Sequence, residues 1–401
     1  MDRRRQYKCV PAVQTMHKDT AVCQFETKIG REPLKLTYFC ALLKPDLMDT
    51  YVFIRLLQQL IATPSLSRHE AGTARILQEF FAEHGIATQR VLHNVFAFNR
   101  CFDKNKPTLL LNSHHDTVAP NAGYTRPPFE PVVEQGRLYG LGSNDAGGAL
   151  VALIAAFLHF YDHAHLPLNI CLAATAEEEC SGKNGIEQVL PLLSDVHFAI
   201  VGEPTGMQMA VAEKGLMVLD CTATGKAGHA AREEGINAIY IALEDIERVR
   251  RFEFPKVSPF LGKIKMSVTL IEAGTQHNVV PDRCRFTIDV RVTDSYTPEE
   301  VLETVRTLLQ SEVVPRSMRL RPSFTPVEHP FVQAGLSLGR PCYGSPTLSD
   351  QALLPFPSVK IGPGESARSH SADEYIETAE IEAGIALYIE MLERYFKAQV
   401  R

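Results

Sequence analysis

Apolar residues follow two periodicities along the chain, one typical of helices and one typical of buried strands. From 52 to 61 they fall on one helical face, and a second helix is predicted after Ser67 and Glu70, whose spacing matches a capping box. Three later segments are almost entirely apolar, as in strands buried on both faces, and an apolar helix is predicted over 149–161. These alternating elements predict an α/β fold. The three apolar segments are 108–113, 168–175 and 196–201.

Each of these segments is followed by side chains that can bind a metal. His114 and Asp116 follow the first, Glu178 and Glu179 follow the second, and Glu203 follows the third. Each feature alone has an ordinary explanation, such as histidines that cap a strand or an acidic turn that faces water. Because α/β sheets place their chemistry at the carboxyl ends of strands, three such ends in succession favour a shared site.

A glycine-rich segment, 140–148, surrounds Asp145 just before the predicted apolar helix. Glycines on both sides let the backbone turn tightly and approach another group closely, which suits a carboxylate held in a crowded site. Asp145 can also serve as the N-terminal cap of the helix. The two roles are compatible.

After residue 207 the pattern changes to that of a self-contained module of about 110 residues. The predicted order is β-α-β-β-α-β, as in ferredoxin-like folds, and its second helix opens with a capping box formed by Thr297 and Glu300. The alternating pattern resumes after 322, so the module is inserted rather than appended. Its predicted elements are a strand at 216–224, a helix at 236–250, strands at 263–271 and 285–293, a helix from 298 and a short strand near 319.

The chain thus divides into a leader, a catalytic part in two pieces and the inserted module. In the leader, Arg3 to Arg5 are followed by polar residues and no convincing cleavage site, which argues against a secretory signal. We expect this segment to be disordered or spuriously translated. The predicted boundaries are 1–47 for the leader, 48–208 and 323–401 for the catalytic part, and 209–322 for the module.

Composition restricts the classes of partner. The 401 residues are 45% hydrophobic, enough for a sizeable core, and the net charge of -6 comes without a basic cluster, so neither nucleic acid nor an anionic membrane is expected as a partner. No run reaches the roughly 18 consecutive apolar residues of a membrane span. Nine scattered cysteines without a Cys-x-x-Cys motif predict no disulfide framework and favour a reducing, cytoplasmic location.

Seven motifs in order give the chain a family resemblance over about residues 50 to 400. The chain resembles the acetylornithine deacetylase and succinyl-diaminopimelate desuccinylase family of two-metal amidohydrolases. The motifs are Ser-His-His-Asp-Thr-Val at 113–118, Gly-Ser-Asn-Asp at 142–145, Ala-Glu-Glu-Glu at 176–179, Gly-Glu-Pro-Thr at 202–205, Gly-His-Ala at 228–230, Asn-Val-Val-Pro at 278–281 and Ser-His-Ser-Ala-Asp-Glu at 369–374.

The resemblance implies a zinc-peptidase-like catalytic domain, a mostly parallel mixed sheet between helices, with an inserted lid and dimerisation domain. It also implies two Zn²⁺ per subunit, with Co²⁺ able to substitute. Asp145 would bridge the two ions, and imidazole and carboxylate ligands suit zinc. The implied ligand sets are His114, Asp145 and Glu203 for one ion, and Asp145, Glu179 and His370 for the other.

The same resemblance implies the catalytic roles. Glu178 would be the base that takes a proton from an attacking water and later passes it to the leaving amine, and Asp116 would orient the His114 ring. Glu177 stands where the family usually has aspartate, which leaves a one-position ambiguity among the three acids at 177–179.

Three further residues match family positions that contact the substrate. His229 would stabilise the tetrahedral oxyanion, often from the partner subunit of a homodimer, and Asn278 and Arg291 would bind the substrate's α-carboxylate. His229 can also be an ordinary surface histidine. Arg291 can instead pair with Asp289 or Asp294.

We therefore expect hydrolysis of an N-acyl-L-amino acid, of the N-acetyl- or N-succinyl-ornithine or -citrulline type, in arginine biosynthesis. Ser349-Asp350 resembles the desuccinylase motif more than the deacetylase motif, so desuccinylation of succinyl-diaminopimelate in lysine biosynthesis is an alternative. A dipeptidase or carboxypeptidase on the same scaffold is another. A non-catalytic binding protein would have lost the base or a ligand, and every such position is filled.

Overall fold

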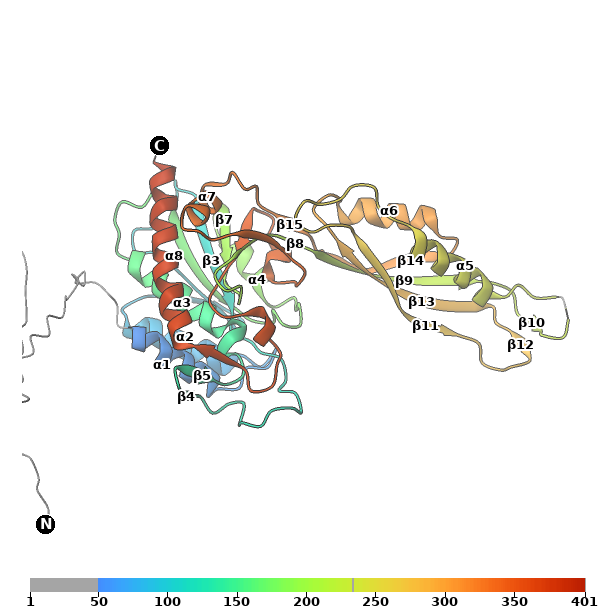
Figure 1. Cartoon of the computed structure of the whole chain (residues 1–401), viewed down its shortest axis with the longest axis horizontal. Helices are drawn as coiled ribbons and strands as arrows, with labels where there is room; N and C mark the ends of the chain where they lie inside the picture. Colours follow the sequence, from blue (N-terminus) through green and yellow to red (C-terminus); the bar gives the residue numbers. More distant parts are fainter. Residues whose placement is uncertain (1–49, 233, 401) are drawn as a thin grey trace, which may run out of the picture. The chain divides into compact units, whose positions relative to one another are not determined.

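The structure is a computed structural model that describes residues 50–232 and 234–400. The predicted leader, 1–47, lies outside the described residues. The described part contains a large sheet covered by helices and a second, four-stranded sheet with two helices of its own (Figure 1). Both follow from the two periodicities of the sequence, so the predicted α/β class is confirmed.

The large sheet is mixed, and its centre is parallel. Strands β6, β3, β7 and β17 are neighbours and run in the same direction, whereas β2 and β8 pair antiparallel at either side. Every residue of β3 and β6 is buried, which is the physical reason for their unbroken apolar sequences. Among the described residues this sheet has nine strands: β1 (Gln89–Val91), β2 (Asn94–Phe98), β3 (Thr108–His114), β6 (Asn169–Thr175), β7 (Val196–Val201), β8 (Met209–Glu213), β15 (Ser323–Phe324), β16 (Cys342–Ser345) and β17 (Ser358–Lys360).

Helices cover both faces of this sheet. Figure 1 shows α3 and α8 together on one face and α4 on the other. Ser143–Phe160, which includes α3, is long and apolar enough to cross a membrane by composition, but 83% of it is buried inside the protein, as expected of a core helix. The helices of this part are α1 (Thr50–Ile61), α2 (Ala71–Glu83), α3 (Gly148–Phe160), α4 (Ile186–Val189), α7 (Pro330–Ser337) and α8 (Thr378–Gln399), with short helical turns η1 (Ser143–Gly147), η2 (Leu190–Leu192), η3 (Asp350–Leu353) and η4 (Ser366–Arg368).

The predicted capping box of α2 is wrong, and the difference matters for the site. The Ser67 hydroxyl donates to the Asp116 carboxylate at 2.7 Å instead of capping the helix. The Glu70 carboxylate is fully buried and accepts the backbone N–H groups of Arg68 and Glu177. Both polar side chains therefore serve long-range contacts, which local spacing cannot reveal.

The four-stranded sheet has the order β11-β13-β9-β14, and all its pairings are antiparallel. Helices α5 and α6 bury their apolar stripes against one face, and the predicted capping box of Thr297 and Glu300 is present at the start of α6. The segment 209–213, placed in the module by the predicted boundary, pairs in the large sheet as β8. The elements are β9 (Gly215–Thr224), α5 (Ala238–Arg251), β11 (Lys265–Ala273), β13 (Arg283–Val292), α6 (Pro298–Leu308) and β14 (Glu312–Leu320), which is nine residues long rather than short.

The chain passes from the large sheet to the four-stranded sheet after β8 and returns after β14. These two connecting segments are in contact at Gly215. A Cβ atom there would lie 2.7 Å from the Leu320 carbonyl oxygen and 2.6 Å from the Pro322 nitrogen, so only glycine fits. Two small sheets complete the described fold: β4 (Val132–Glu134), β5 (Arg137–Tyr139) and β18 (Tyr375–Glu377) form one, and β10 (Gly228–His229) and β12 (Val279–Val280) form the other.

Candidate metal centre

The carboxyl ends of three adjacent parallel strands meet at one edge of the large sheet. His114 is the last residue of β3, Glu178 and Glu179 follow β6, and Glu203 follows β7. Because β6, β3 and β7 are neighbours, the side chains predicted from their strand ends do come together.

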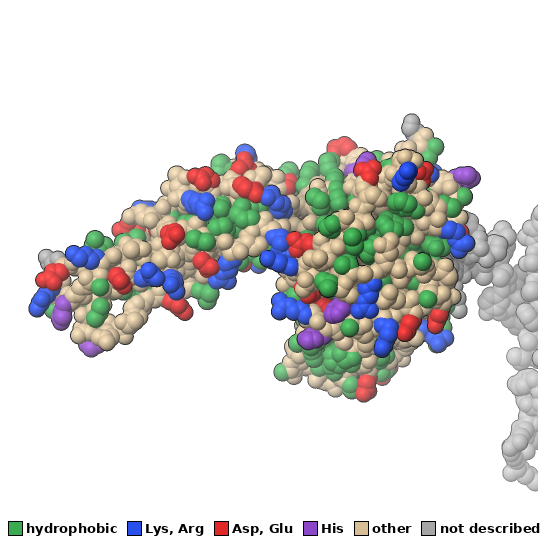
Figure 2. Space-filling view, turned by 180° about the vertical axis from the view of Figure 1, so that it is seen from behind, with side chains coloured by type: hydrophobic (Ala, Val, Ile, Leu, Met, Phe, Trp, Pro, Cys, Tyr) green, Lys and Arg blue, Asp and Glu red, His purple; other side chains and the backbone are tan. Residues whose placement is uncertain are grey.

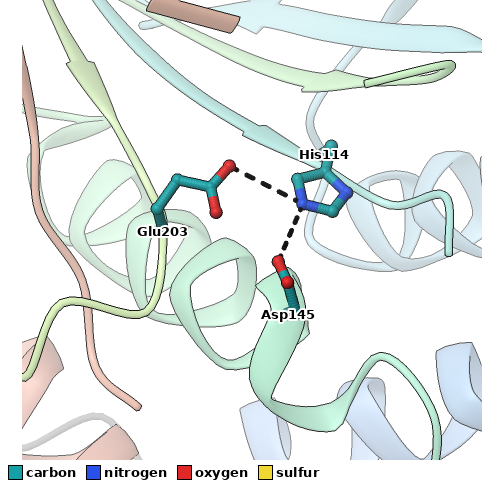
Figure 3. Close-up of side chains that lie close together, drawn as sticks. All are labelled: His114, Asp145 and Glu203. Carbon is teal, nitrogen blue, oxygen red and sulfur yellow. Dashed lines mark hydrogen bonds and ion pairs between the residues drawn. The ribbon is translucent and has the colours of Figure 1, made fainter. Parts of the chain in front are cut away.

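The first donor group contains His114, Asp145 and Glu203 (Figure 3). His114 Nε2 lies 3.3 Å from Asp145 Oδ1 and 3.7 Å from Glu203 Oε1. Asp145 comes from η1, where the neighbouring glycines allow the chain to pack closely, so it reaches the strand ends from the start of α3.

The second donor group contains Asp145, Glu179 and His370. His370 Nε2 lies 2.9 Å from Glu179 Oε2 and 3.6 Å from Asp145 Oδ2. Asp145 therefore points one carboxylate oxygen at each imidazole. Its position between the two groups is that of a bridging ligand.

These donor sets fit two divalent cations. Within each group the donor atoms lie within 4.8 Å of one another, and tetrahedral coordination at about 2.0–2.1 Å places ligand atoms about 3.3 Å apart. Burial, together with the nearby Asp145 charge, raises the pKa of Glu203 to about 8, although His114 opposes this shift. A bound cation would remove the cost of keeping these carboxylates charged.

The three consecutive acids, Glu177, Glu178 and Glu179, have three different environments. Glu177 is turned away, and its carboxylate accepts hydrogen bonds from the backbone and side chain of Asn184 at 3.3 and 2.8 Å. Glu179 belongs to the second donor group. Glu178 lies outside both groups, with its Oε2 3.9 Å from His114 Nε2. Burial raises the pKa of Glu178 well above its usual range, which suits a group that must take up a proton.

Asp116 connects the histidine to the acidic turn. Its backbone carbonyl accepts a hydrogen bond from His114 Nδ1 at 3.0 Å, and its carboxylate lies 3.5 Å from the same nitrogen. The carboxylate also accepts the backbone N–H groups of Glu178 and Glu179 at 3.1 and 3.2 Å. Asp116 thus contacts the ring of His114, chiefly through its backbone carbonyl, and its carboxylate binds the turn that carries the two glutamates.

Glu374 is a buried residue of the site that the sequence reasoning missed. Its carboxylate accepts the backbone N–H groups of Asn144 and Asp145 at 2.8 and 2.9 Å, so it holds the bridging residue in place. Burial raises its pKa to about 8. The only signal in the sequence was its presence in the same motif as His370.

Ser349 and Asp350 lie in the interior beneath the site. The Asp350 carboxylate accepts hydrogen bonds from Asn112 and Thr175 on β3 and β6, at 2.8 and 2.7 Å. Ser349 donates to the buried carboxylate of Glu213. Burial raises the pKa of Asp350 to about 6, and both residues act here as internal packing partners of the strands.

His229 and Asn278 are not brought to the metal centre within one chain. His229 is exposed, and its neighbour Ala230 donates to the Asn278 carbonyl. The β10–β12 pair continues beyond the Thr224 end of β9, whereas the Gly215 end adjoins β8. At about 3.3 Å per residue the length of β9 separates these ends by roughly 30 Å.

Arg291 is paired within the module. Its guanidinium donates to both oxygens of Asp289, at 2.9 and 3.2 Å. Of the two pairings left open by the sequence, the structure shows the one with Asp289. Arg291 lies opposite Leu216 on β9, far along the strand from Asn278, so one chain does not bring these two residues together.

Two ligand groups that share a carboxylate, with a free carboxylate beside them, define a two-metal hydrolase. The chain belongs to peptidase family M20/M25/M40, whose model matches residues 110–394. The chain is therefore a metal-dependent hydrolase of this family rather than a non-catalytic binding protein.

Individual relatives agree with this assignment. The chain is 25% identical over 374 residues to a succinyl-diaminopimelate desuccinylase of Halorhodospira halophila, a match that covers 85% of this chain and 97% of the relative. Among solved structures it is similar to a tripeptidase of Staphylococcus aureus (TM-score 0.68, 21% identity, 88% of this chain and 100% of that one). It is also similar to the Bacillus subtilis YXEP protein, described as a dinuclear metal-binding peptidase (TM-score 0.68, 17% identity, 88% and 98%). At these identities the structures support the fold alone.

Proposed function

We propose that the protein hydrolyses the amide bond of an N-acyl-L-amino acid and releases a carboxylate and the free amino acid. The proposal rests chiefly on one observation: Asp145 joins two three-residue donor groups, and Glu178 stands beside them without belonging to either. We further propose Zn²⁺ as the metal at both groups, with Co²⁺ able to substitute, because imidazole and carboxylate donors suit both ions.

The residues of the site have different roles in the proposed reaction. Metal ions bound at the two groups would supply Lewis acidity toward a water and the amide carbonyl. Glu178 takes the proton of the attacking water and delivers it to the nitrogen of the leaving amine. Asp116 and Glu374 keep the ligands in place, since they bind the backbone of the residues that carry them.

We propose N-acetyl or N-succinyl derivatives of ornithine or citrulline as substrates, which would place the enzyme in arginine biosynthesis. The name of the Halorhodospira halophila relative favours succinyl-diaminopimelate and lysine biosynthesis instead. The names of several structural neighbours favour a peptide substrate: they include a metallo-carboxypeptidase and a carnosine dipeptidase.

A substrate panel with metal removal tests this function. We expect the purified protein to release acetate or succinate from at least one N-acyl amino acid, because two metals and one carboxylate base suit unactivated amides. A chelator should reduce the rate by at least about 100-fold, and added Zn²⁺ or Co²⁺ should restore it. Release of an amino acid from dipeptides, with no N-acyl amino acid cleaved, would favour the peptidase alternative.

We propose that the enzyme is a homodimer that forms through the inserted module. Within the part of the chain that the structure describes, β11 is an edge strand of the four-stranded sheet, and α5 contacts it. Tyr240 and Leu243 on α5, and Leu270 and Ile271 on β11, are more than half exposed although they are large and apolar. A second copy would cover these side chains and could pair with the strand edge.

Mixed dimers test whether the site is shared between subunits. His229 lies on β10, beyond the end of β9 that is remote from the large sheet, and so does not reach its own metal centre. A chain with Glu178→Ala and a chain with His229→Ala should therefore complement each other. We expect each pure variant to be nearly inactive and a refolded equimolar mixture to regain up to about a quarter of wild-type turnover, since one site in the mixed dimer is intact. No recovery, in a mixture shown by mass to contain mixed dimers, would contradict the sharing of the site.

We propose a small-molecule substrate as the main partner, with no role for nucleic acid or membrane. On the face shown in Figure 2, basic and acidic side chains are interspersed, without a continuous basic patch. We also propose a cytoplasmic location. The cysteines in the described part of the chain are free, which suits a reducing compartment.

A further inference from the structure

The turn that carries Glu178 and Glu179 is held from two sides. On its inner side Asp116 accepts the N–H groups of both glutamates. Within the turn, Ser181 donates its N–H to the Glu178 carbonyl at 2.7 Å, and Gly182 donates to the Glu177 carbonyl at 2.8 Å. The turn is tight, so a shift at its outer end moves the residues that face the metal centre.

Arg319, at the end of the inserted sheet, holds the outer side of this turn. Its Nη1 donates to the Gly182 carbonyl at 3.3 Å and to the Glu187 carboxylate, and its Nη2 donates to the Ser181 carbonyl. The side chains of Arg319 and Glu187 are 23% and 29% exposed, so the contact is largely shielded from water. A guanidinium is planar and has several fixed donors, which lets one side chain bind three acceptors at once.

The pairing of β14 with its neighbour is irregular around Arg319. The pairing of β14 with β9 shifts register between Ser317 and Leu320. The N–H of Arg319 donates to the Ser317 hydroxyl at 3.2 Å. Such irregularities are a common means of re-aiming a side chain near a functional site.

We propose that Arg319 is a positioning residue for the metal centre, acting through the Ser181 and Gly182 carbonyls on Glu178 and Glu179. The proposal rests on the roles proposed above for these two glutamates. Gly182, whose carbonyl Arg319 binds, is packed against Glu177 so closely that an added Cβ would lie 1.9 Å from the Glu177 carboxylate. The inserted module thus contributes to the centre within the same chain.

A purely structural link between the two sheets would have the same contacts, so the experiment must measure the centre itself. Metal-free wild-type protein and variants are titrated with Zn²⁺ against a competing chelator, and kcat and KM are measured for the best substrate of the panel. The variants are Arg319→Ala, Arg319→Lys and the control Arg316→Ala. Arg316 lies on the same strand, but its guanidinium binds Asp220 within the module, so its loss leaves the turn untouched.

For Arg319→Ala we expect the affinity for one of the two zinc ions to fall by at least about tenfold, as is typical when residues that orient metal ligands are removed. We expect kcat to fall by a similar factor with KM changed less than about twofold. The zinc affinity and kcat of Arg319→Lys should lie between those of Arg319→Ala and wild type, because lysine keeps the positive charge but lacks the planar guanidinium with its several donors. Arg316→Ala should match wild type.

Wild-type zinc affinity in Arg319→Ala, with a lower melting temperature alone, would overturn the proposal and leave only a structural link. Should Arg319→Ala fail to fold, wild-type zinc affinity in Arg319→Lys would overturn it as well. The titration needs no substrate. It therefore decides the role of Arg319 even if the protein cleaves none of the proposed N-acyl amino acids.

Discussion

Glu178→Gln is expected to reduce turnover by about three orders of magnitude while both metal ions remain bound. The substitution keeps the size of the side chain but removes its ability to take a proton, and general-base catalysis contributes typically 10²–10⁴-fold. Glu178 belongs to neither donor group, so metal content should stay at that of the wild type. Turnover is measured with the best substrate of the panel, and metal content by elemental analysis.

The neighbouring acid provides a matched control. Glu177 binds Asn184 and is turned away from the cluster, so Glu177→Gln should lower the melting temperature yet leave the turnover of folded protein within about tenfold of wild type. If Glu177→Gln were the inactive variant and Glu178→Gln the active one, the assignment within the acidic triplet would be wrong.

Asp145→Ala is expected to remove both metal ions and all measurable activity. Its two carboxylate oxygens lie beside different imidazoles, 3.3 Å from His114 and 3.6 Å from His370, so one substitution takes a ligand from each group. Activity should fall by at least about 10³-fold, because the Lewis acid and the activated water are lost together. Zinc content per chain is the direct measurement.

His370→Ala provides the comparison for this prediction. It removes a ligand from the second group only, so one zinc ion per chain should remain at His114, Asp145 and Glu203. One remaining ion in Asp145→Ala as well would mean that Asp145 does not bridge the two sites.

Much of the centre was predictable because its residues follow apolar strands. Strands such as β3 and β6 are buried on both faces, so their sequences are unbroken apolar runs, and the polar residues after them stand out. The parallel order of β6, β3 and β7 then places these residues at one edge. The family resemblance added His370, which lies ten residues after β17 and not directly at the end of a strand.

The rest depended on contacts between residues far apart in sequence. Ser67 and Glu70 have the spacing of a helix cap, yet both side chains bind residues beyond position 115. Glu374 binds a backbone more than 200 residues away, and Arg319 binds the acidic turn from a part of β14 where the strand pairing is irregular. Strand β8 is five residues long and has no polar alternation, so its periodicity did not separate it from the module.

The close contact between the two connecting segments at Gly215 has a consequence for how such a protein can be altered. The module leaves and re-enters the large sheet at neighbouring points, since β8 before it pairs with β15 after it. A short linker from Lys214 to Ser323 would therefore restore a continuous chain without crossing the sheet, and all five candidate metal ligands would be retained. An inserted module whose two ends lie side by side can be gained, exchanged or deleted as a unit, because the large sheet and its helices have a hydrophobic core of their own.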